Sequence, residues 1–372
     1  MNINVEDLYM WTEKYRPTRL DDIISQQHIS TSLKCFMSQG MLPHMLFYGP
    51  PGTGKTSMIK CCVIELFGRI NNPMVLYSNA SIERGIDDVR TTILPFANHK
   101  SECILNAPYF DNSNAKARYK IIILDEMDNM TSDAQNILRK VIEDSVNTVF
   151  CLIGNNINKI NVALQSRCTL FRFSPLQPID MLQKLKHICQ VENNNAANLN
   201  TLNYTDDDLL KIVRVCNGDM RQAINNIQNI STRVIGDVTL DDSTSSPSNT
   251  RSNATVVGVN GITSASEIYT LIGYASPQII TTVYNLITHR HHSIKSIYED
   301  ISTIILNNNL QVSNILNELC DRVVLDDTIE LQTKQKIIDK LATIEYNDID
   351  GINQRSSIRT LIAVFALNCK HT

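Results

Sequence analysis

The sequence lacks a long hydrophobic run, a paired cysteine motif and an excess of basic charge. Because no segment is long and apolar enough to cross a bilayer, we expect no membrane partner. Glu6 and Asp7 stand where a secretory signal would be basic and then apolar, so we expect an intracellular protein. The 10 cysteines include no Cys-x-x-Cys pair, which favours reduced packing residues over a zinc site.

The charge balance limits how the chain could hold nucleic acid. Lys and Arg total 34 and Asp and Glu total 38, which gives a net charge of −4. Up to residue 172 there are 18 basic and 17 acidic residues, and 16 and 21 follow. Neither part is basic enough to hold DNA by bulk charge, so a contact would need a few placed residues or several subunits. The 372 residues exceed one typical core and predict two or three domains.

The most informative stretch is residues 45–56, an apolar run that ends in a glycine-rich turn, a lysine and a threonine. Its spacing matches the phosphate-binding P-loop, in which glycines let backbone N–H groups converge on an anion at a helix N-terminus. Lys55 would reach the outer phosphates, and the Thr56 hydroxyl would hold Mg²⁺. The alternative is a plain Gly/Pro turn, but a predicted strand precedes the motif and a predicted helix, 57–67, follows it. The predicted ATP-binding loop comprises Gly49, Pro50, Pro51, Gly52, Thr53, Gly54, Lys55, Thr56 and Ser57.

A second apolar run, residues 119–126, ends in two carboxylates. This pattern is typical of a buried parallel strand whose C-terminal tip faces a ligand. Asp125 would then hold the Mg²⁺ shell, and Glu126 would orient and deprotonate the attacking water. Carboxylates at strand ends are often purely structural, but a P-loop lies about seventy residues upstream and favours the catalytic interpretation.

A third buried strand is predicted at 148–153 and ends at Gly154-Asn155-Asn156. The Asn155 amide could hold the attacking water or the outermost phosphate, or it could cap a turn; the residues alone favour neither. Further strands are predicted at 74–77 and 169–173. Helices are predicted at 29–36, at 85–93, where Pro95 should kink or end the helix, and from Thr131 or Ser132 to about Asp144. Residues 99–118 are polar and predict a surface loop insertion.

Beyond Pro175 and Pro178 the predicted elements are all helical. The first group of helices is predicted at 179–192, at 206–216 and from the N-cap near Asp219 to about Thr232. Residues 236–265 are rich in Ser, Thr, Asn and Gly and predict a loosely tethered linker. The second group is predicted at 266–273, 277–288, 294–307, 312–321, 328–344 and 355–369. No catalytic constellation appears there, which favours a role in assembly.

Taken in order, these motifs resemble the small subunits of the eukaryotic clamp loader replication factor C, which are AAA+ ATPases. The resemblance covers nearly the whole chain outside the two insertions. Its segments are Trp-Thr-Glu-Lys-Tyr-Arg-Pro at 11–17, Leu-Pro-His-Met-Leu-Phe-Tyr-Gly-Pro-Pro-Gly-Thr-Gly-Lys-Thr at 42–56, Asn-Ala-Ser at 79–81, Arg-Gly-Ile-Asp at 84–87, Ile-Leu-Asp-Glu at 123–126, Ala-Gln-Asn-Ile-Leu-Arg-Lys-Val-Ile-Glu at 134–143, Ser-Arg-Cys at 166–168 and Gly-Asp-Met-Arg at 218–221. Residues 273–277 and 340–346 resemble one particular small subunit of the family more than the others.

The resemblance implies roles for residues that composition and spacing do not single out. Tyr15, Arg16 and the backbone of Ile23 and Ile24 would border the adenine. Asn155 takes the sensor 1 position, and Arg221 takes the sensor 2 position in the lid. Arg167 has the place of the arginine finger, which acts in trans on ATP held by a neighbouring subunit. An ordinary surface ion pair is the alternative for Arg167.

The resemblance also implies contacts with DNA and with the sliding clamp PCNA. Arg84 and Arg90 match the region that follows the DNA backbone, so recognition of a primer–template junction would be by shape rather than by sequence. Ile93 and Phe96 match the apolar helix that touches the clamp, although Pro95 lies between them.

Three residues depart from the family pattern. Ser25 stands where the family usually has a glycine beside the base pocket, and Ile82 stands where it usually has an acid. The segment Asp125-Glu-Met-Asp128 departs only at Met127 from the family's Asp-Glu-Ala-Asp and keeps both working carboxylates.

We therefore expect an α/β AAA+ ATPase domain with a parallel sheet, a small helical lid and an all-α collar that holds five subunits in a ring. The expected boundaries are 1–174 for the ATPase domain, 175–235 for the lid, 236–265 for the linker and 266–372 for the collar. ATP and Mg²⁺ are the expected cofactors, the other replication factor C subunits are expected partners, and the family role implies the nucleus. The alternatives are a hexameric DNA-remodelling ATPase and a scaffold that binds ATP without hydrolysis.

Overall fold

The computed structural model describes residues 10–82, 85–98, 119–195, 205–240, 269, 273–288, 293–308, 310–349 and 354–368. The chain forms two units, one of residues 1–201 and 212–228 and the other of residues 202–211 and 229–372. The predicted insertion at 99–118 lies outside the described residues. No helix in the described part of the chain has the length and apolarity that a membrane span requires.

The first unit contains a five-stranded sheet in which every strand is parallel to its neighbours, in the order β2-β3-β4-β1-β5. The strands are β1 Met45–Tyr48, β2 Val75–Asn79, β3 Lys120–Asp125, β4 Thr148–Gly154 and β5 Thr169–Arg172. The predicted strands are confirmed to within two residues at each end. Because the strands are parallel, their carboxyl ends meet at one edge, and the P-loop and the Asp125 carboxylate both follow from that edge.

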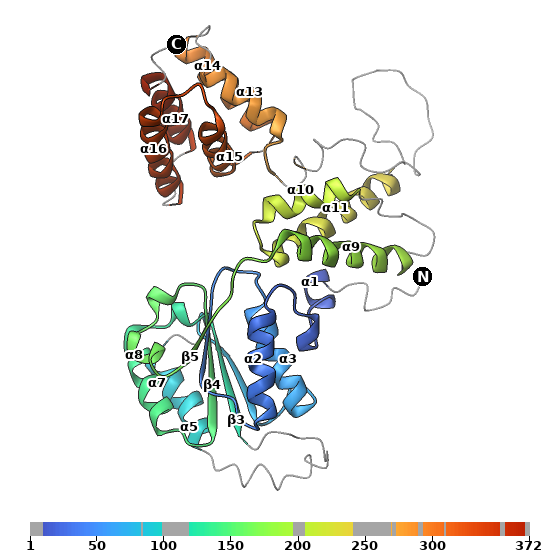
Figure 1. Cartoon of the computed structure of the whole chain (residues 1–372), viewed down its shortest axis with the longest axis vertical. Helices are drawn as coiled ribbons and strands as arrows, with labels where there is room; N and C mark the ends of the chain where they lie inside the picture. Colours follow the sequence, from blue (N-terminus) through green and yellow to red (C-terminus); the bar gives the residue numbers. More distant parts are fainter. Residues whose placement is uncertain are drawn as a thin grey trace. The chain divides into compact units, whose positions relative to one another are not determined.

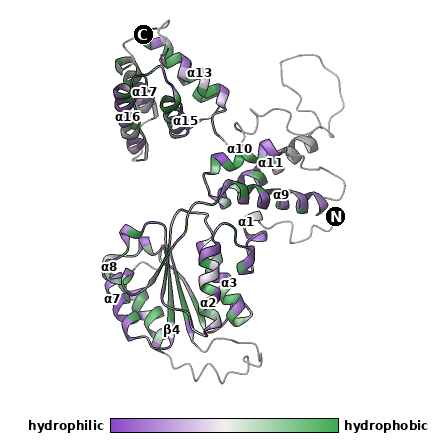
Figure 2. Cartoon of the chain, in the orientation of Figure 1, coloured by the Kyte–Doolittle hydropathy of each residue, from purple (hydrophilic) through white to green (hydrophobic). Residues whose placement is uncertain are grey.

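Alternate residues of the central strands pack on opposite faces of the sheet. Phe47 and Cys151 face helices α2, Gln27–Ser38, and α3, Lys55–Phe67, whereas Leu46 and Leu152 face α7, Ser132–Asp144 (Figure 1). Figure 2 shows the strands as mostly hydrophobic and the covering helices as two-sided. This is the pattern that a sheet buried on both faces requires.

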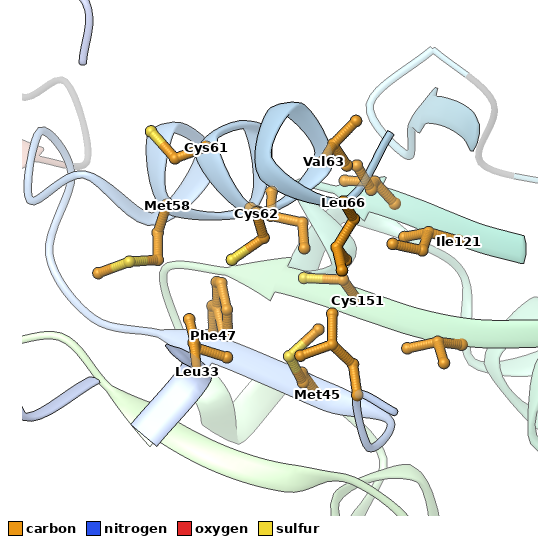
Figure 3. Packing of buried hydrophobic residues seen from close by; sticks show 14 of the residues in the cluster. Leu33, Met45, Phe47, Met58, Cys61, Cys62, Val63, Leu66, Ile121 and Cys151 are labelled. Carbon is orange, nitrogen blue, oxygen red and sulfur yellow. The ribbon is translucent and has the colours of Figure 1, made fainter. Parts of the chain in front are cut away.

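Cysteines supply part of the packing between α3 and the sheet. Cys62 of α3 and Cys151 of β4 are fully buried and lie among Met45, Phe47 and Leu66 (Figure 3). Burial raises the pKa of the Cys151 thiol well above its usual value, so this thiol stays protonated and apolar.

Pro95 does not end its helix, which was one of the two outcomes expected for it. A helical path runs through α4, Ile86–Asp88, a π-helical segment, Val89–Ile93, and α5, Leu94–Asn98. The Leu94 N–H bonds to the Val89 carbonyl, five residues back. The usual bond to the fourth preceding carbonyl, which proline cannot make, is therefore already interrupted, and the wider turn admits Pro95.

Short elements connect the sheet and its covering helices. They are α1 Trp11–Lys14, η2 Leu20–Asp22, η4 Met127–Asn129, η5 Ile157–Lys159 and α8 Val162–Gln165. The lid helices are α9 Pro178–Asn195, α10 Asp206–Cys216 and α11 Met220–Leu240. Helix α11 runs past Thr232, so the first five residues of the predicted linker, 236–240, are helical, and the rest of that segment lies outside the described residues.

The second unit contains a helical bundle of α13 Pro277–Thr288, α14 Ile294–Asn307, α15 Val312–Leu325, α16 Leu331–Ile349 and α17 Gln354–Asn368. Its core is made by apolar side chains at helical spacing, such as Ile301, Leu319, Ile337 and Phe365, each fully buried. These helices confirm the predicted ones, although α15 and α16 each extend several residues beyond the predicted ends. The helix predicted at 266–273 falls almost wholly outside the described residues.

Candidate nucleotide-binding site

The loop between β1 and α3 has a backbone that only glycine fits at two points. Gly49 has φ of 144°, and a Cβ there would lie 2.2 Å from the carbonyl oxygen of Phe173. Gly52 has φ of 67°, and a Cβ there would lie 1.7 Å from the Asp219 carboxylate. The loop then enters α3 at Lys55, so its N–H groups and the positive end of the helix dipole point at the same place.

Lys55 lies inside this loop rather than on the surface, with 7% of the residue exposed. Its Nζ donates hydrogen bonds to the carbonyl oxygens of Gly49, at 2.8 Å, and Pro50, at 2.6 Å. Burial lowers the pKa of Lys55 to about 8, although the nearby Asp125 carboxylate acts in the opposite direction. The ammonium is therefore held where an anion bound by the loop would meet it.

Asp125 lies at the tip of β3, opposite the start of α3. Its Oδ2 accepts the Thr56 hydroxyl at 2.9 Å and the Tyr77 hydroxyl at 2.8 Å, and its Oδ1 accepts the Glu126 N–H at 2.9 Å. Carboxylate and hydroxyl oxygens are the ligands that Mg²⁺ prefers, so the Thr56 and Asp125 pair fits this metal. Nothing in the sequence singles out Tyr77, because one tyrosine on an edge strand belongs to no motif.

Glu126 follows in the left-handed backbone conformation, with φ of 56°. Its Oε2 accepts a hydrogen bond from the Ser81 hydroxyl and a second, at 3.2 Å, from the Asn129 side chain. Asn129 also donates to Ser81 at 2.9 Å. Ser81 belongs to the Asn-Ala-Ser segment noted above, so the motif was a signal for it, whereas nothing in the sequence marked Asn129. Ile82, at the departure from the family pattern, is 83% exposed.

One pocket brings most of the predicted site residues together. It is lined by Thr12, Tyr15, Arg16, Pro17, Asp22, Ile23, Ile24, Pro51, Gly52, Thr53, Gly54, Lys55, Thr56, Ser57, Asp125, Glu126, Asn155, Leu176, Lys184, Met220, Arg221 and Ile224. The predicted residues Gly49 and Pro50 shape the loop but do not line the pocket. Lys184 of α9 and the apolar Ile224 of α11 do line it, and sequence reasoning missed both.

The two asparagines after β4 have different roles in the fold. Asn156 caps the short helix η5, because its side chain accepts the Asn158 N–H at 3.0 Å. Asn155 lines the pocket, and its backbone N–H points to the Asp128 carboxylate at 3.4 Å. The turn is therefore capped without the side chain of Asn155.

The adenine-side residues predicted from the family are tied to the lid. The Tyr15 hydroxyl donates to the Glu192 carboxylate of α9, which also forms an ion pair with Lys14 at 2.8 Å. Burial, and then the bond to Glu192, raise the pKa of Tyr15. Arg16 forms an ion pair with Glu13 at 2.7 Å.

Arg167 is not among the residues that line the pocket. It lies between α8 and β5, donates to the Ala163 carbonyl at 2.7 Å and forms an ion pair with Glu143 of α7. Its side chain is 32% exposed. An action on ATP would thus have to involve a site on another chain.

The residues predicted to contact DNA and the clamp are only partly described. Arg84 lies outside the described residues, and Arg90 is exposed on the π-helical segment. Ile93 is 1% exposed and packs in the core under the sheet with Val89 and Leu138, so its side chain is not available to a partner. The assignment of Ile93 as a clamp contact is therefore corrected; Phe96, in the next helix, is only partly buried.

The parallel sheet, the P-loop ending in Lys55 and Thr56, and the acidic pair at the tip of β3 define a P-loop ATPase of the AAA class. Residues 45–176 match the family model described as "ATPase family associated with various cellular activities (AAA)". Residues 275–364 match the model described as "Replication factor C C-terminal domain".

Curated relatives match over most of their length. The chain is 37% identical to a putative replication factor C small subunit of Acanthamoeba polyphaga mimivirus, over 95% of this chain and 93% of that protein. It is 36% identical to human replication factor C subunit 5, over 95% and 91%. It is 35% identical to Schizosaccharomyces pombe replication factor C subunit 3, over 96% and 91%. A solved structure of the Thermotoga maritima RuvB Holliday junction branch migration motor matches with a TM-score of 0.46 and 14% identity, over 77% of this chain and 85% of that chain.

The chain belongs to the replication factor C small-subunit family of clamp-loader ATPases. This confirms the family resemblance, the expected fold class and the assignment as an ATPase that works within a complex of replication factor C subunits. The small subunit that residues 273–277 and 340–346 most resemble is the one called subunit 3 in fungi and subunit 5 in animals, and relatives with both names match.

Proposed function

We propose that this chain is an ATP-hydrolysing member of a heteropentameric clamp loader, which opens the sliding clamp PCNA and loads it at primer–template junctions. Binding of ATP would shape the ring so that it opens the clamp and holds DNA, and hydrolysis would release the closed clamp. The nucleus is the proposed location, because DNA replication in eukaryotic cells takes place there.

The observation that carries this proposal is the convergence of Lys55, Thr56, Asp125 and Glu126 in one pocket. Lys55 would bind the outer phosphates, and Thr56 and Asp125 would hold Mg²⁺, which neutralises phosphate charge when it is bound. The ammonium uses two of its three donors on loop carbonyls, so a phosphate oxygen could be the third acceptor.

Glu126 would accept the proton of the attacking water. The hydrogen bonds from Ser81 and Asn129 both reach Oε2, and a carboxylate has a second oxygen that can accept this proton. Asn155 would orient the water or the outermost phosphate from the tip of β4. Tyr15, Arg16 and Ile24 would border the base, and Arg221 would approach the phosphates from the lid.

Each ATP site in the ring would be completed by an arginine of the neighbouring subunit. Arg167 would exchange its contact with Glu143 for the ATP of the next subunit, where a guanidinium stabilises the charge that develops in the transition state. Arg84 and Arg90 would contact DNA phosphates, which fixes position but reads no sequence. Phe96 would contribute to the contact with the clamp.

The test uses the complete reconstituted complex and single-turnover hydrolysis of ATP. Loss of a general base commonly slows the chemical step by about 100-fold or more, so Glu126→Gln in this chain should remove the fast phosphate release that belongs to its site. Asp133→Asn, an acid in the first turn of α7, is the control. Unchanged rate and amplitude in the Glu126→Gln complex would mean that the site binds ATP without hydrolysis.

A second variant tests action in trans. Arg167→Ala should slow hydrolysis at the neighbouring site while this chain still binds nucleotide. If turnover in the complex is unaffected, the arginine serves only its ion pair with Glu143. Native mass measurement of the assembly separates the clamp-loader proposal from a DNA-remodelling motor, for which a homohexamer is expected.

A further inference from the structure

The loop before α2 contains a backbone conformation that is unusual for its residue type. Ser25 has φ of 59°, in the left-handed region that favours glycine. Among the described residues, the other non-glycine residues with positive φ are Glu126 and Asn217. Such strained positions persist only where surrounding contacts hold them, and they concentrate at functional sites.

The contacts that hold Ser25 come from the start of the lid. Its hydroxyl donates to the Asp180 carboxylate in the first turn of α9 and accepts the Gln177 N–H, at 3.1 Å, just before that helix. The next residue, Gln26, is fully buried and donates from its side-chain amide to the Ser174 carbonyl at 2.7 Å. Three hydrogen bonds therefore join residues 25–26 to residues 174–180.

The residues on either side of this junction line the candidate nucleotide pocket. Ile23 and Ile24, which precede Ser25, line the pocket, and so does Lys184 from the helix that Ser25 contacts. The lid also touches the P-loop through the Met220 N–H, which points to the Gly52 carbonyl at 3.3 Å. With the contacts of Tyr15 and Lys14 to Glu192, the lid is thus attached both to the predicted base-side residues and to the P-loop.

We propose that Ser25 is a positioning residue whose hydroxyl fastens helix α9 to the base-side loop. A base that orders Ile23 and Ile24 would then also fix the lid, because the same short loop carries both contacts. This inference rests on the proposed binding of ATP. A glycine would supply the left-handed backbone without a hydroxyl, so the serine gives this chain a connection that the backbone alone does not require.

The test is amide hydrogen exchange of peptides covering 174–186, measured in the full reconstituted complex with and without ADP. A hydrogen bond to a charged group typically changes an equilibrium by about tenfold or more. Ser25→Gly keeps the backbone conformation and should raise exchange across the start of α9 by about tenfold and reduce the protection that ADP gives there. Ser25→Ala should do the same, because it also lacks the hydroxyl.

Two further variants make the outcome specific. Asp180→Ala should loosen α9 similarly, and in the Ser25→Gly background it should add little, since both changes remove the same bond. Asp21→Ala is the matched control, because Asp21 lies nearby but forms an ion pair with Lys34 and touches no lid residue among its described contacts.

Each result decides the inference. Unchanged exchange in Ser25→Gly, or loosening in Ser25→Ala alone, would overturn it, because backbone strain rather than the hydroxyl would then be responsible. Fully additive effects of Ser25→Gly and Asp180→Ala would also overturn it. These failures would leave ADP binding itself intact, whereas failure of the proposed function would appear as loss of ADP protection at the P-loop in the unmodified complex.

Discussion

The nucleotide-binding unit and the C-terminal helical bundle bury different kinds of side chain. The first unit buries Lys55, Lys120 and Gln26, each with a hydrogen-bond partner, and it also contains strained backbone at Ser25 and Glu126. Within the described part of 273–368, the buried polar side chains are those of two serines, and no charged side chain is buried. A buried polar group costs stability unless it is hydrogen-bonded, so a domain built only for packing buries few of them. The bundle fits that description, whereas the polar groups buried in the first unit fit a unit that performs chemistry.

The largest effect should come from the bundle core. Phe365 is fully buried and packs edge-on against Tyr284, with ring centroids 6.4 Å apart. Phe365→Ala should lower the free energy of unfolding of the bundle by about 3–5 kcal/mol, through lost burial and a cavity. Chemical denaturation of the full chain measures this loss, and Leu367→Ala, at a site 66% exposed, is the control. ADP binding should survive in native conditions; its loss would break the comparison between the two units.

The second variant changes the P-loop of the nucleotide-binding unit instead of the bundle core. Lys55→Ala should weaken ATP binding at this site by about 100-fold or more, because it removes a charged donor from a desolvated phosphate site. Lys140→Ala, at an exposed position of α7 outside the pocket lining, is the control. Equilibrium titration with a fluorescent ATP analogue measures the affinity. Assembly with the other subunits in the absence of nucleotide should be unchanged, and impaired assembly would contradict the division of roles.

The bundle was predictable from periodicity because each helix buries one apolar stripe against its neighbours. The same holds for β3 and β4, where an uninterrupted apolar run specifies a strand buried on both faces. The P-loop residues were predictable for a different reason. A loop that curves around a phosphate requires glycines at fixed spacing and a lysine after them.

The missed residues share a physical cause. Tyr77, Asn129 and Lys184 come from three separate elements. Only the folded chain brings Lys184 to the pocket and the other two to the carboxylates of Asp125 and Glu126. The helix continues through Pro95 because a π turn precedes it, and the sequence pattern did not predict that turn. Ile93 was misjudged because a resemblance transfers a position but not its exposure, and here the side chain turns into the core.

A substitution at Tyr77 should have a smaller effect and tests whether this residue supports metal binding through Asp125. Its hydroxyl is one of two that the Asp125 Oδ2 accepts, and Lys60 lies over its ring at 5.5 Å. Tyr77→Phe keeps the ring and removes this bond, and loss of such outer partners commonly weakens metal binding by about tenfold. Manganese binding in the presence of ADP, followed by electron paramagnetic resonance, should show that weakening. Tyr346→Phe, on an exposed residue of α16, is the matched control.

An unchanged manganese affinity would mean that Thr56 and the Glu126 N–H suffice to orient Asp125. In that case the contribution of this part of the chain to the site would be limited to Ser81, which follows the end of β2.

The smallest effect is a dependence of nucleotide affinity on pH. Burial lowers the pKa of Lys55 to about 8, so the free site loses its ammonium charge as the pH rises through that value. A bound phosphate favours the protonated form, and binding above pH 8 must therefore take up a proton. Affinity should be nearly constant below pH 7 and should fall by up to about tenfold by pH 9. For folding without ligand the sign is opposite. The pKa of Lys55 in the folded chain lies below the ordinary lysine value of 10.5, so this group should raise stability as the pH increases from about 8 to that value.

Calorimetric titrations with ADP in two buffers of different ionisation enthalpy measure the proton uptake directly. Lys55→Arg should abolish it, because a guanidinium stays charged throughout this range. Lys334 donates to the Val324 carbonyl in the bundle and lies outside the pocket, so Lys334→Arg should leave the uptake unaltered. If the proton uptake persists in Lys55→Arg, the titrating group is another residue of the pocket. Desolvation of Lys55 would then not explain the pH dependence of nucleotide binding by this unit.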